Sequence, residues 1–247
     1  MAYPANLAIE FKTPYETGST QIYPIGQKAE TPDGSIYRYC KMGGTIGVAN
    51  KTYQGAATAV ANWTTQAHTV AIAVGDTEIS FTDGGTAFTA DQLAGGTILV
   101  QETDDLGHIY RVKSNVATAS NETVCQLEDG VTVKVAVAVA AGNVLTANLS
   151  PWREIIITPT TTPTNIVVGV PRVVIAANGF GWVQSRGVAS CLTVGAPLPG
   201  NPVIVAGTTA GGITLAASQT TNITGYLGRV LNLGIAGDFA AVFLTLE

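Results

Sequence analysis

Apolar and polar residues alternate along much of this chain, in runs that are short. Clear examples are 35–41 (SIYRYCK), 78–82 (EISFT), 108–113 (HIYRVK) and 131–139 (VTVKVAVAV), in the last of which every odd position is valine. A period of two places alternate side chains on one face of a β-strand. Each of these runs therefore predicts a strand with one apolar face.

Turn-forming residues separate the alternating runs. The stretch 168–192 is the clearest hairpin, because Asn178-Gly179 lies between two β-prone runs and such turns need positive φ at both central residues. Phe180 and Trp182 would supply apolar area to one side of this hairpin. A second turn is expected near Arg186-Gly187.

Other strand-sized runs complete the pattern, and no long segment has the 3.6-residue period of an amphipathic helix. They lie at 69–74, 97–102, 123–127, 203–206, 213–216, 226–233 and 240–246. Many short strands separated by turns are typical of sandwiches and barrels. The sequence therefore predicts an all-β fold, with an N-terminal extended arm followed by two small β-sandwich or β-barrel domains.

Proline and threonine mark the expected boundaries of these parts. Residues 1–30 carry three prolines and little periodicity, which predicts an extended arm. The run 158–165 (TPTTTPTN) is extended and cannot join a central strand, so it is expected to be a linker. The first β domain is then 31–157 and the second is 166–247.

The predicted arm carries apolar side chains dotted along a polar segment. Such a segment is either a loose terminus or an arm that becomes ordered against a partner, where aromatic side chains are enriched. The second interpretation makes these side chains candidate partner-binding residues: Tyr3, Ile9, Phe11, Tyr15, Ile22 and Tyr23.

Composition narrows the possible functions. Charged residues make up 12% of the chain and its net charge is −5, which disfavours a nucleic-acid partner. No apolar run is long enough for a membrane helix, and the first residues do not resemble a signal peptide. Cys40, Cys125 and Cys191 are far apart and odd in number, so each is expected to be a small buried residue in a reducing compartment.

Groups with catalytic or metal-binding chemistry are sparse. His68 and His108 are the only histidines, and His68 has no nearby cysteine or carboxylate. Asp104 and Asp105 lie just upstream of His108, but this spacing on a turn is a weak signal for a triad or a metal site, and His108 is expected at an exposed strand start. Asp83-Gly84-Gly85 and Asp104-Asp105 could bind calcium, but turn formation explains both motifs. The sequence therefore predicts a protein that is not an enzyme and has no cofactor, metal or small-molecule substrate.

Several segments together resemble the head decoration, or capsid cement, proteins of tailed bacteriophages. The first runs from Asp33-Gly34 through 35–45 to 51–54 and matches an N-terminal pattern of this family, with Ser35 where a basic residue is commoner. A middle segment, 93–97 with 107–112, is similar to a second pattern. The segment 168–187, with GFGWVQSRG at its end, is similar to a third, and 227–229 and 241–246 also fit.

This resemblance implies a non-enzymatic virion protein, made in the host cytoplasm and located on the outer surface of a phage head. Its partner would be the major capsid protein, and it would stabilise the capsid by clamping neighbouring subunits, as a homotrimer in many such proteins. Neither nucleic acid nor membrane would be bound. The alternative is a carbohydrate-binding fibre or adhesin module, in which Trp63 and Trp152 would stack on sugars instead of packing in a core.

Overall fold

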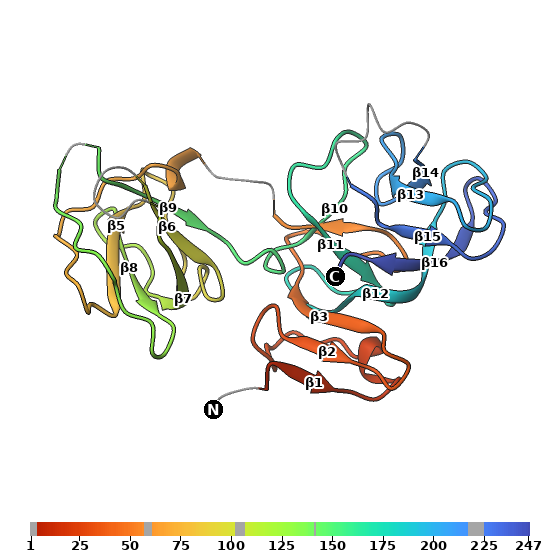
Figure 1. Cartoon of the computed structure of the whole chain (residues 1–247), viewed down its shortest axis with the longest axis horizontal. Coiled ribbons are helices and arrows are strands. Elements are labelled where there is room, and N and C mark those ends of the chain that lie inside the picture. Colours follow the sequence, from red (N-terminus) through yellow and green to blue (C-terminus); the bar gives the residue numbers. More distant parts are fainter. Residues whose placement is uncertain (1–3, 57–60, 102–106, 141, 217–224) are drawn as a thin grey trace. The chain divides into compact units, whose positions relative to one another are not determined.

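The computed structural model describes residues 4–56, 61–101, 107–140, 142–216 and 225–247. Those residues form an all-β structure with one large mixed sheet, one five-stranded antiparallel sheet and no α-helix (Figure 1). The all-β prediction is confirmed. In the described residues, no helix has the length and apolar character needed to cross a membrane.

The chain divides into two compact units, and their boundaries differ from the predicted ones. Unit 1 combines Met1–Ala57 with Pro151–Glu247, and unit 2 is the stretch Thr58–Ser150 between them. The expected linker 158–165 belongs to unit 1. Its threonines find partners there: the Thr158 and Thr52 hydroxyls are 2.7 Å apart, and Gln54 Nε2 donates to Thr164 Oγ1 at 2.8 Å.

Unit 1 contains the large sheet. Its elements are β1 (Asn6–Ala8), the 3-10 turn η1 (Thr13–Tyr15), β2 (Lys28–Glu30), β3 (Ile36–Lys41), β4 (Tyr53–Gln54), β10 (Ile156–Ile157), β11 (Val167–Pro171), β12 (Phe180–Leu192), β13 (Pro202–Val205), β14 (Ile213–Leu215), β15 (Gly228–Val230) and β16 (Phe239–Thr245). The strand order is β1-β2-β3-β12-β16-β15-β13-β14, with β11 also paired to β12 and β4 paired to both β11 and β10. β1 and β2 run parallel, and the other strand pairs in the described part of this unit are antiparallel.

The long strand β12 organises unit 1. Its first half pairs with β3 and its second half with β16. The chain after β12 returns to β14, where Val194 N–H donates to Ile213 O at 2.7 Å. The strands from β12 to β14 thus curl around a core of small and branched residues, which includes Cys191, Val203 and Val242.

Residues 6–30 do not form a free arm. β1 adds to β2, β2 adds to β3, and the N–H of Ile9 donates to Glu30 O at 3.0 Å. Ile9, Ile25 and Ala29 are buried in a cluster that also contains Trp182. The prediction of an extended arm is wrong here, because the buried apolar side chains of this segment pack against other residues of the same chain.

The hairpin signals at 168–192 are only partly right. β11 and β12 are antiparallel, but residues 172–179 connect them as a longer loop, and Asn178 has a positive φ of 58° while Gly179 does not. No turn follows at Arg186-Gly187, because β12 continues through a β-bulge between Gln184 and Arg186. Gly187 has a φ of +93°, and a Cβ there would meet Ser35. A bulge and a turn both use a positive-φ glycine, so the local sequence does not separate them.

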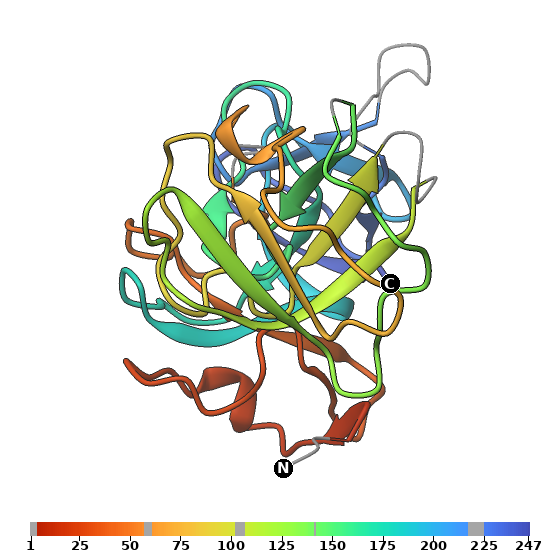
Figure 2. The same ribbon diagram turned by 90° about the vertical axis from the view of Figure 1, so that its left-hand side faces the viewer.

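Unit 2 contains the five-stranded sheet, whose strands are drawn in yellow to green in Figure 2. Its elements are the 3-10 turn η2 (Ala61–Trp63), β5 (Glu78–Thr82), β6 (Thr97–Gln101), β7 (Ile109–Asn115), β8 (Glu122–Leu127) and β9 (Val144–Asn148), in the order β5-β8-β7-β6-β9. Its core holds the ring pair Trp63 and Phe88, with centroids 4.3 Å apart.

The run 131–139 has the most regular alternation in the sequence, yet it is not a strand. Val133 and Val137 are buried, and the run meets the segment 72–76 through a bridge between Val137 and Ile72 and through backbone hydrogen bonds of Val133 with Gly75 and Asp76, both 2.9 Å, without forming a ladder. The alternation correctly selects the buried side chains. It does not supply the neighbouring strand whose hydrogen bonds a ladder requires.

Candidate partner-binding surface

The predicted anchors of the N-terminal segment divide into buried and exposed groups. Ile9 is buried, and Tyr23 is half-buried against Trp182, with ring centroids 5.3 Å apart. Phe11, Tyr15 and Ile22 are 57%, 52% and 63% exposed. Tyr3 lies outside the described residues. The structure therefore leaves three of the six side chains on the surface of unit 1.

Arg172 fixes the position of Tyr15. Its Nη1 donates to Tyr15 Oη at 3.1 Å, its Nε donates to Gln184 Oε1 at 3.1 Å, and its Nη2 donates to Val188 O at 3.2 Å. The guanidinium also lies over the rings of Tyr15 and Tyr37, at 5.8 and 5.5 Å from their centroids. A planar guanidinium suits such combined stacking and hydrogen bonding. The exposed N-terminal segment is thus attached to the bulge of β12.

Tyr37 lies beneath this arrangement. Burial raises the pKa of its phenol to about 12, and the nearby charge of Arg172 acts in the opposite direction. Its hydroxyl is therefore neutral at physiological pH, and its ring packs against the Arg172 guanidinium.

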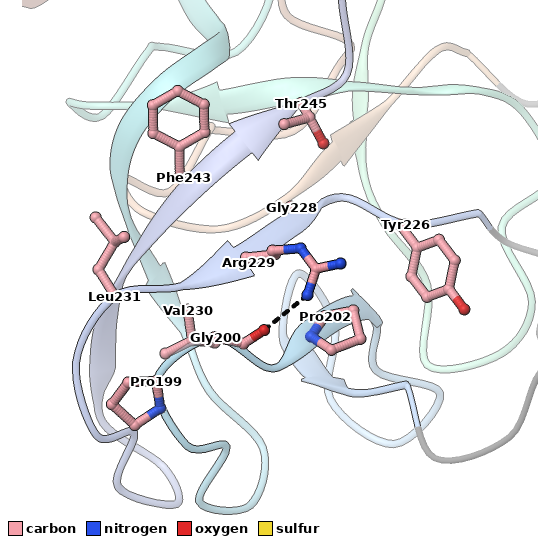
Figure 3. A pocket seen from close by; sticks show the side chains of 10 residues that line it. All are labelled: Pro199, Gly200, Pro202, Tyr226, Gly228, Arg229, Val230, Leu231, Phe243 and Thr245. Carbon is pink, nitrogen blue, oxygen red and sulfur yellow. Dashed lines mark hydrogen bonds between the residues drawn. The ribbon is translucent and has the colours of Figure 1, made fainter.

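A hollow of about 710 Å³ lies elsewhere on unit 1, on the outward side of β15 and β16 (Figure 3). Ten residues line it: Pro199, Gly200, Pro202, Tyr226, Gly228, Arg229, Val230, Leu231, Phe243 and Thr245. Figure 3 shows the Arg229 guanidinium directed to the side where Tyr226 lies, away from Phe243 and Leu231. Arg229 Nη1 donates to Gly200 O at 2.9 Å. The hollow is apolar with one cation in it.

The strand register explains how these side chains come together. Val188 of β12 is opposite Phe243 of β16, Phe243 is opposite Arg229 of β15, and Arg229 is opposite Pro202 of β13. All four belong to the outward side, because the intervening residues, such as Val242, are buried. One row of outward side chains therefore crosses four strands.

The sequence analysis missed this hollow, although a signal for it is present. β16 has the sequence FAAVFLT, in which Ala240, Val242 and Leu244 face the core and Phe239 and Phe243 face outward. Apolar residues on both faces of a strand indicate that both faces are covered or available for contact. The alternation of apolar and polar residues predicts only the inward-facing side chains of this strand.

The histidines and the aspartate turns have structural surroundings. His68 is buried, and its Nδ1 lies 2.9 Å from Val70 O, whereas His108 is exposed just before β7, as expected. Asp83 Oδ1 accepts the Gly85 N–H at 2.9 Å, which is turn chemistry. Asp104 and Asp105 lie outside the described residues. Within the described ranges, no group of three or more His, Cys, Asp or Glu residues could hold a metal ion.

The three cysteines are free and buried, as the sequence predicts. Burial raises the pKa of Cys40, Cys125 and Cys191 to about 12 in each case. A thiol in this state is a poor nucleophile, because the thiolate is the reactive form. These residues therefore act as small apolar core residues.

The two tryptophans considered for sugar stacking both have partners inside their own unit. Trp63 is buried against Phe88, and its Nε1 donates to Thr86 O at 2.7 Å. Trp152 is partly buried, and the Arg38 guanidinium lies 4.8 Å from its ring centroid. Trp63 therefore packs as a core residue, and Trp152 packs at the edge of the core of unit 1.

Comparison of the chain with protein-family models, with curated proteins and with solved structures found no match in any of the three searches.

Proposed function

We propose that this chain is a non-enzymatic structural protein of a phage virion, which decorates the outside of the head and stabilises it by clamping neighbouring major capsid protein subunits. The observation that carries the proposal is where the segments resembling the decoration family lie. They are far apart in sequence, yet in unit 1 they form β3, β4, β11 and β12, which pair with one another.

The pairing involves the most distinctive residues of those segments. Trp182 of the GFGWVQSRG stretch is opposite Tyr39 of the IYRYCK strand, and their ring centroids are 5.1 Å apart. Gly187 approaches Ser35, which follows Asp33-Gly34. The resemblance therefore falls on one interlocked centre and not on scattered turns, as expected if the segments preserve a shared fold.

The two halves of the middle resembling segment are also joined by backbone hydrogen bonds, within unit 2. Gly95 N–H donates to Val112 O at 2.8 Å, and Val112 N–H donates to Gly96 O at 3.0 Å. The two halves of the segment, 93–97 and 107–112, are thus joined where β6 and β7 begin to pair. We propose the finer form of the fold on the same basis, with each unit a small β-barrel or sandwich; the return of β14 to the end of β12 supports it for unit 1.

A surface that carries few charges suits clamping. Only 12% of the chain is charged, so few ions lose water when a neighbouring protein covers the surface. A protein that binds the assembled shell and not its free subunits stabilises the shell by mass action. Of the six candidate anchors, the exposed Phe11, Tyr15 and Ile22 are the proposed contacts of the N-terminal segment with the capsid, and a homotrimer is the proposed form.

The experiment mixes purified full-length chain with heads that lack it, followed by sedimentation and by heating of the decorated heads. Saturable co-sedimentation and a higher disruption temperature are expected. Because β1 and β2 are part of the sheet, point changes are preferable to deleting residues 1–30. Phe11→Ser with Ile22→Ser should weaken binding, while the matched exposed change Val116→Ser in unit 2 should not.

Three outcomes count against the proposal. A wild-type chain that stays in the supernatant at all concentrations refutes the decoration function. A monomeric mass in solution and on heads refutes the trimer. Unchanged binding of the Phe11 and Ile22 double variant refutes the N-terminal contact. The alternative of a fibre or adhesin module has less support, because Trp63 and Trp152 pack inside their own units; binding to a glycan array would favour it.

A further inference from the structure

We propose that the hollow on β15 and β16 docks an extended segment of the partner protein, with a carboxylate side chain seated between apolar side chains. The inference deepens the proposed function, on which it rests for the identity of the partner. It concerns a surface separate in sequence from Phe11 and Ile22, and it names the chemistry of the segment that binds.

Charge complementarity decides what the occupant must carry. Arg229 is exposed at the hollow and makes a hydrogen bond to one carbonyl, Gly200 O, which leaves other guanidinium donors available. None of the ten described lining residues is acidic. A purely apolar occupant would strip water from the cation without replacing its hydrogen bonds, which is costly. A carboxylate accepts two parallel hydrogen bonds from a guanidinium.

A second cation strengthens the same face. Arg186 lies outward on β12 opposite Thr245, which itself lines the hollow. The outward side chains of β12, β15 and β16 thus include two arginines and no Asp or Glu. An acidic segment is therefore attracted to the end of the face where Phe243 and Thr245 lie opposite Arg229 and Arg186.

The apolar surface extends past the hollow, which favours a peptide segment over a small molecule. Phe239 lies four residues before Phe243 on the same side of β16, and both are exposed. Four residues of a strand span about 13 Å. Because an extended peptide also repeats every two residues, its alternate side chains can follow this row, with the carboxylate at the guanidinium on the Tyr226 side and apolar side chains over Phe243 and Leu231.

The test uses the full-length chain and two synthetic probes. One is the acidic peptide acetyl-Val-Asp-Phe-Asp-Val-amide, and the other is its neutral analogue with Asn in place of Asp. Binding is followed by NMR through the backbone amides of Gly228 and Val230 in the hollow. The variant Arg229→Gln removes the charge at an exposed position and keeps donors for Gly200 O, and Arg111→Gln in unit 2 is the matched control.

We expect the acidic peptide to shift the Gly228 and Val230 signals and to bind about tenfold more tightly than the neutral one, as charge-assisted hydrogen bonds imply. Arg229→Gln should abolish this difference, and Arg111→Gln should preserve it. Equal binding of the two peptides, shifts confined to other parts of the chain, or no binding at millimolar peptide would each overturn the proposal.

Two further results separate this inference from the decoration function and from self-association. If wild-type chain and Arg229→Gln decorate heads equally well, the docking site is refuted while the function stands. If the chain fails to bind heads but distinguishes the peptides, the function is refuted while the site stands. If Phe243→Thr splits a wild-type oligomer measured by light scattering, the face is a contact between copies and the proposal is wrong.

Discussion

Replacing Gly187 by alanine should lower the stability of unit 1 for two separable reasons. Gly187 lies just after the bulge of β12 with a φ of +93°, a conformation that L-residues adopt only at a cost. An alanine Cβ at this position would also meet Ser35, at 3.0 Å from Cβ and 3.1 Å from Cα, with Ser35 Oγ closer still. Rotating the Ser35 hydroxyl would relieve the contact with Oγ alone.

The magnitude follows from these two contributions. The left-handed backbone costs about 1–2 kcal/mol for a residue with a Cβ. Forcing an extra methyl group against a packed strand costs about 1–3 kcal/mol. Gly187→Ala should therefore reduce the free energy of unfolding by about 2–5 kcal/mol, a large part of the 5–15 kcal/mol typical of a domain.

Gly195→Ala is the matched control. Gly195 has a similar φ of +87°, and no heavy atom lies within 4 Å of a Cβ built there, so only the backbone cost applies. Urea unfolding is followed by tryptophan fluorescence in a Trp63→Phe background, in which the signal comes from Trp152 and Trp182 of unit 1. With a slope near 2.5 kcal/mol/M, the midpoint should fall by about 1–2 M for Gly187→Ala and by about 0.5 M for Gly195→Ala.

A double variant isolates the steric contribution. Ser35→Gly removes the Cβ and Oγ that the new methyl group would meet and leaves Cα at 3.1 Å, so adding Gly187→Ala in that background should cost less than in the original background but more than Gly195→Ala alone. Equal midpoint losses for Gly187→Ala and Gly195→Ala in the original background would refute the steric reasoning. An undiminished loss in the Ser35→Gly background would refute the choice of Ser35 as the obstacle.

Two further predictions follow from ionisable groups. Cys40, Cys125 and Cys191, whose pKa burial raises to about 12, should resist an aromatic disulfide reagent at pH 8 and react after unfolding in urea; labelling of the native chain would contradict their burial. Burial acts to raise the pKa of Glu247, but the hydrogen bond and charge of Arg38, with smaller contributions from other groups, bring it below the usual 4.5. This stabilisation is present above pH 4.5 and is lost as the pH falls through the lowered pKa, so the urea midpoints of wild type and Glu247→Gln should differ at pH 7 and converge as the pH falls through that pKa. A constant difference would contradict the ion pair.

The sequence predicts the strands well where a neighbour in the sheet is available. β3, β5, β6, β7 and β12 begin or end within a few residues of the alternating runs that predict them. The run 131–139 fails because its alternation specifies which side chains are buried but not whether another strand completes the ladder. That information lies in residues far away, since the partner of Val137 is Ile72.

The sequence predicts less of the candidate partner-binding surface than of the fold. Aromatic residues in 1–30 indicate an interaction, but they do not say with what; Ile9 and Tyr23 pack within the chain, while Phe11 and Ile22 do not. The hollow depends on the register of four strands, which brings Val188, Phe243, Arg229 and Pro202 into one row. Separations of 14 to 55 residues between neighbours in this row leave no local pattern to detect.

Because β4 pairs with β10, unit 2 is an insertion whose two ends lie next to each other in unit 1. The chain leaves unit 1 shortly after Gln54 and re-enters shortly before Ile156, and these two residues are direct partners in an antiparallel ladder. The ends of the excursion are thus held together by unit 1 itself, and closing them with a short turn costs little chain entropy. An inserted sequence whose ends meet can be lengthened, shortened or replaced with little disturbance to its host. The β4–β10 pair therefore marks the place in unit 1 where an insertion of another length or sequence should be tolerated.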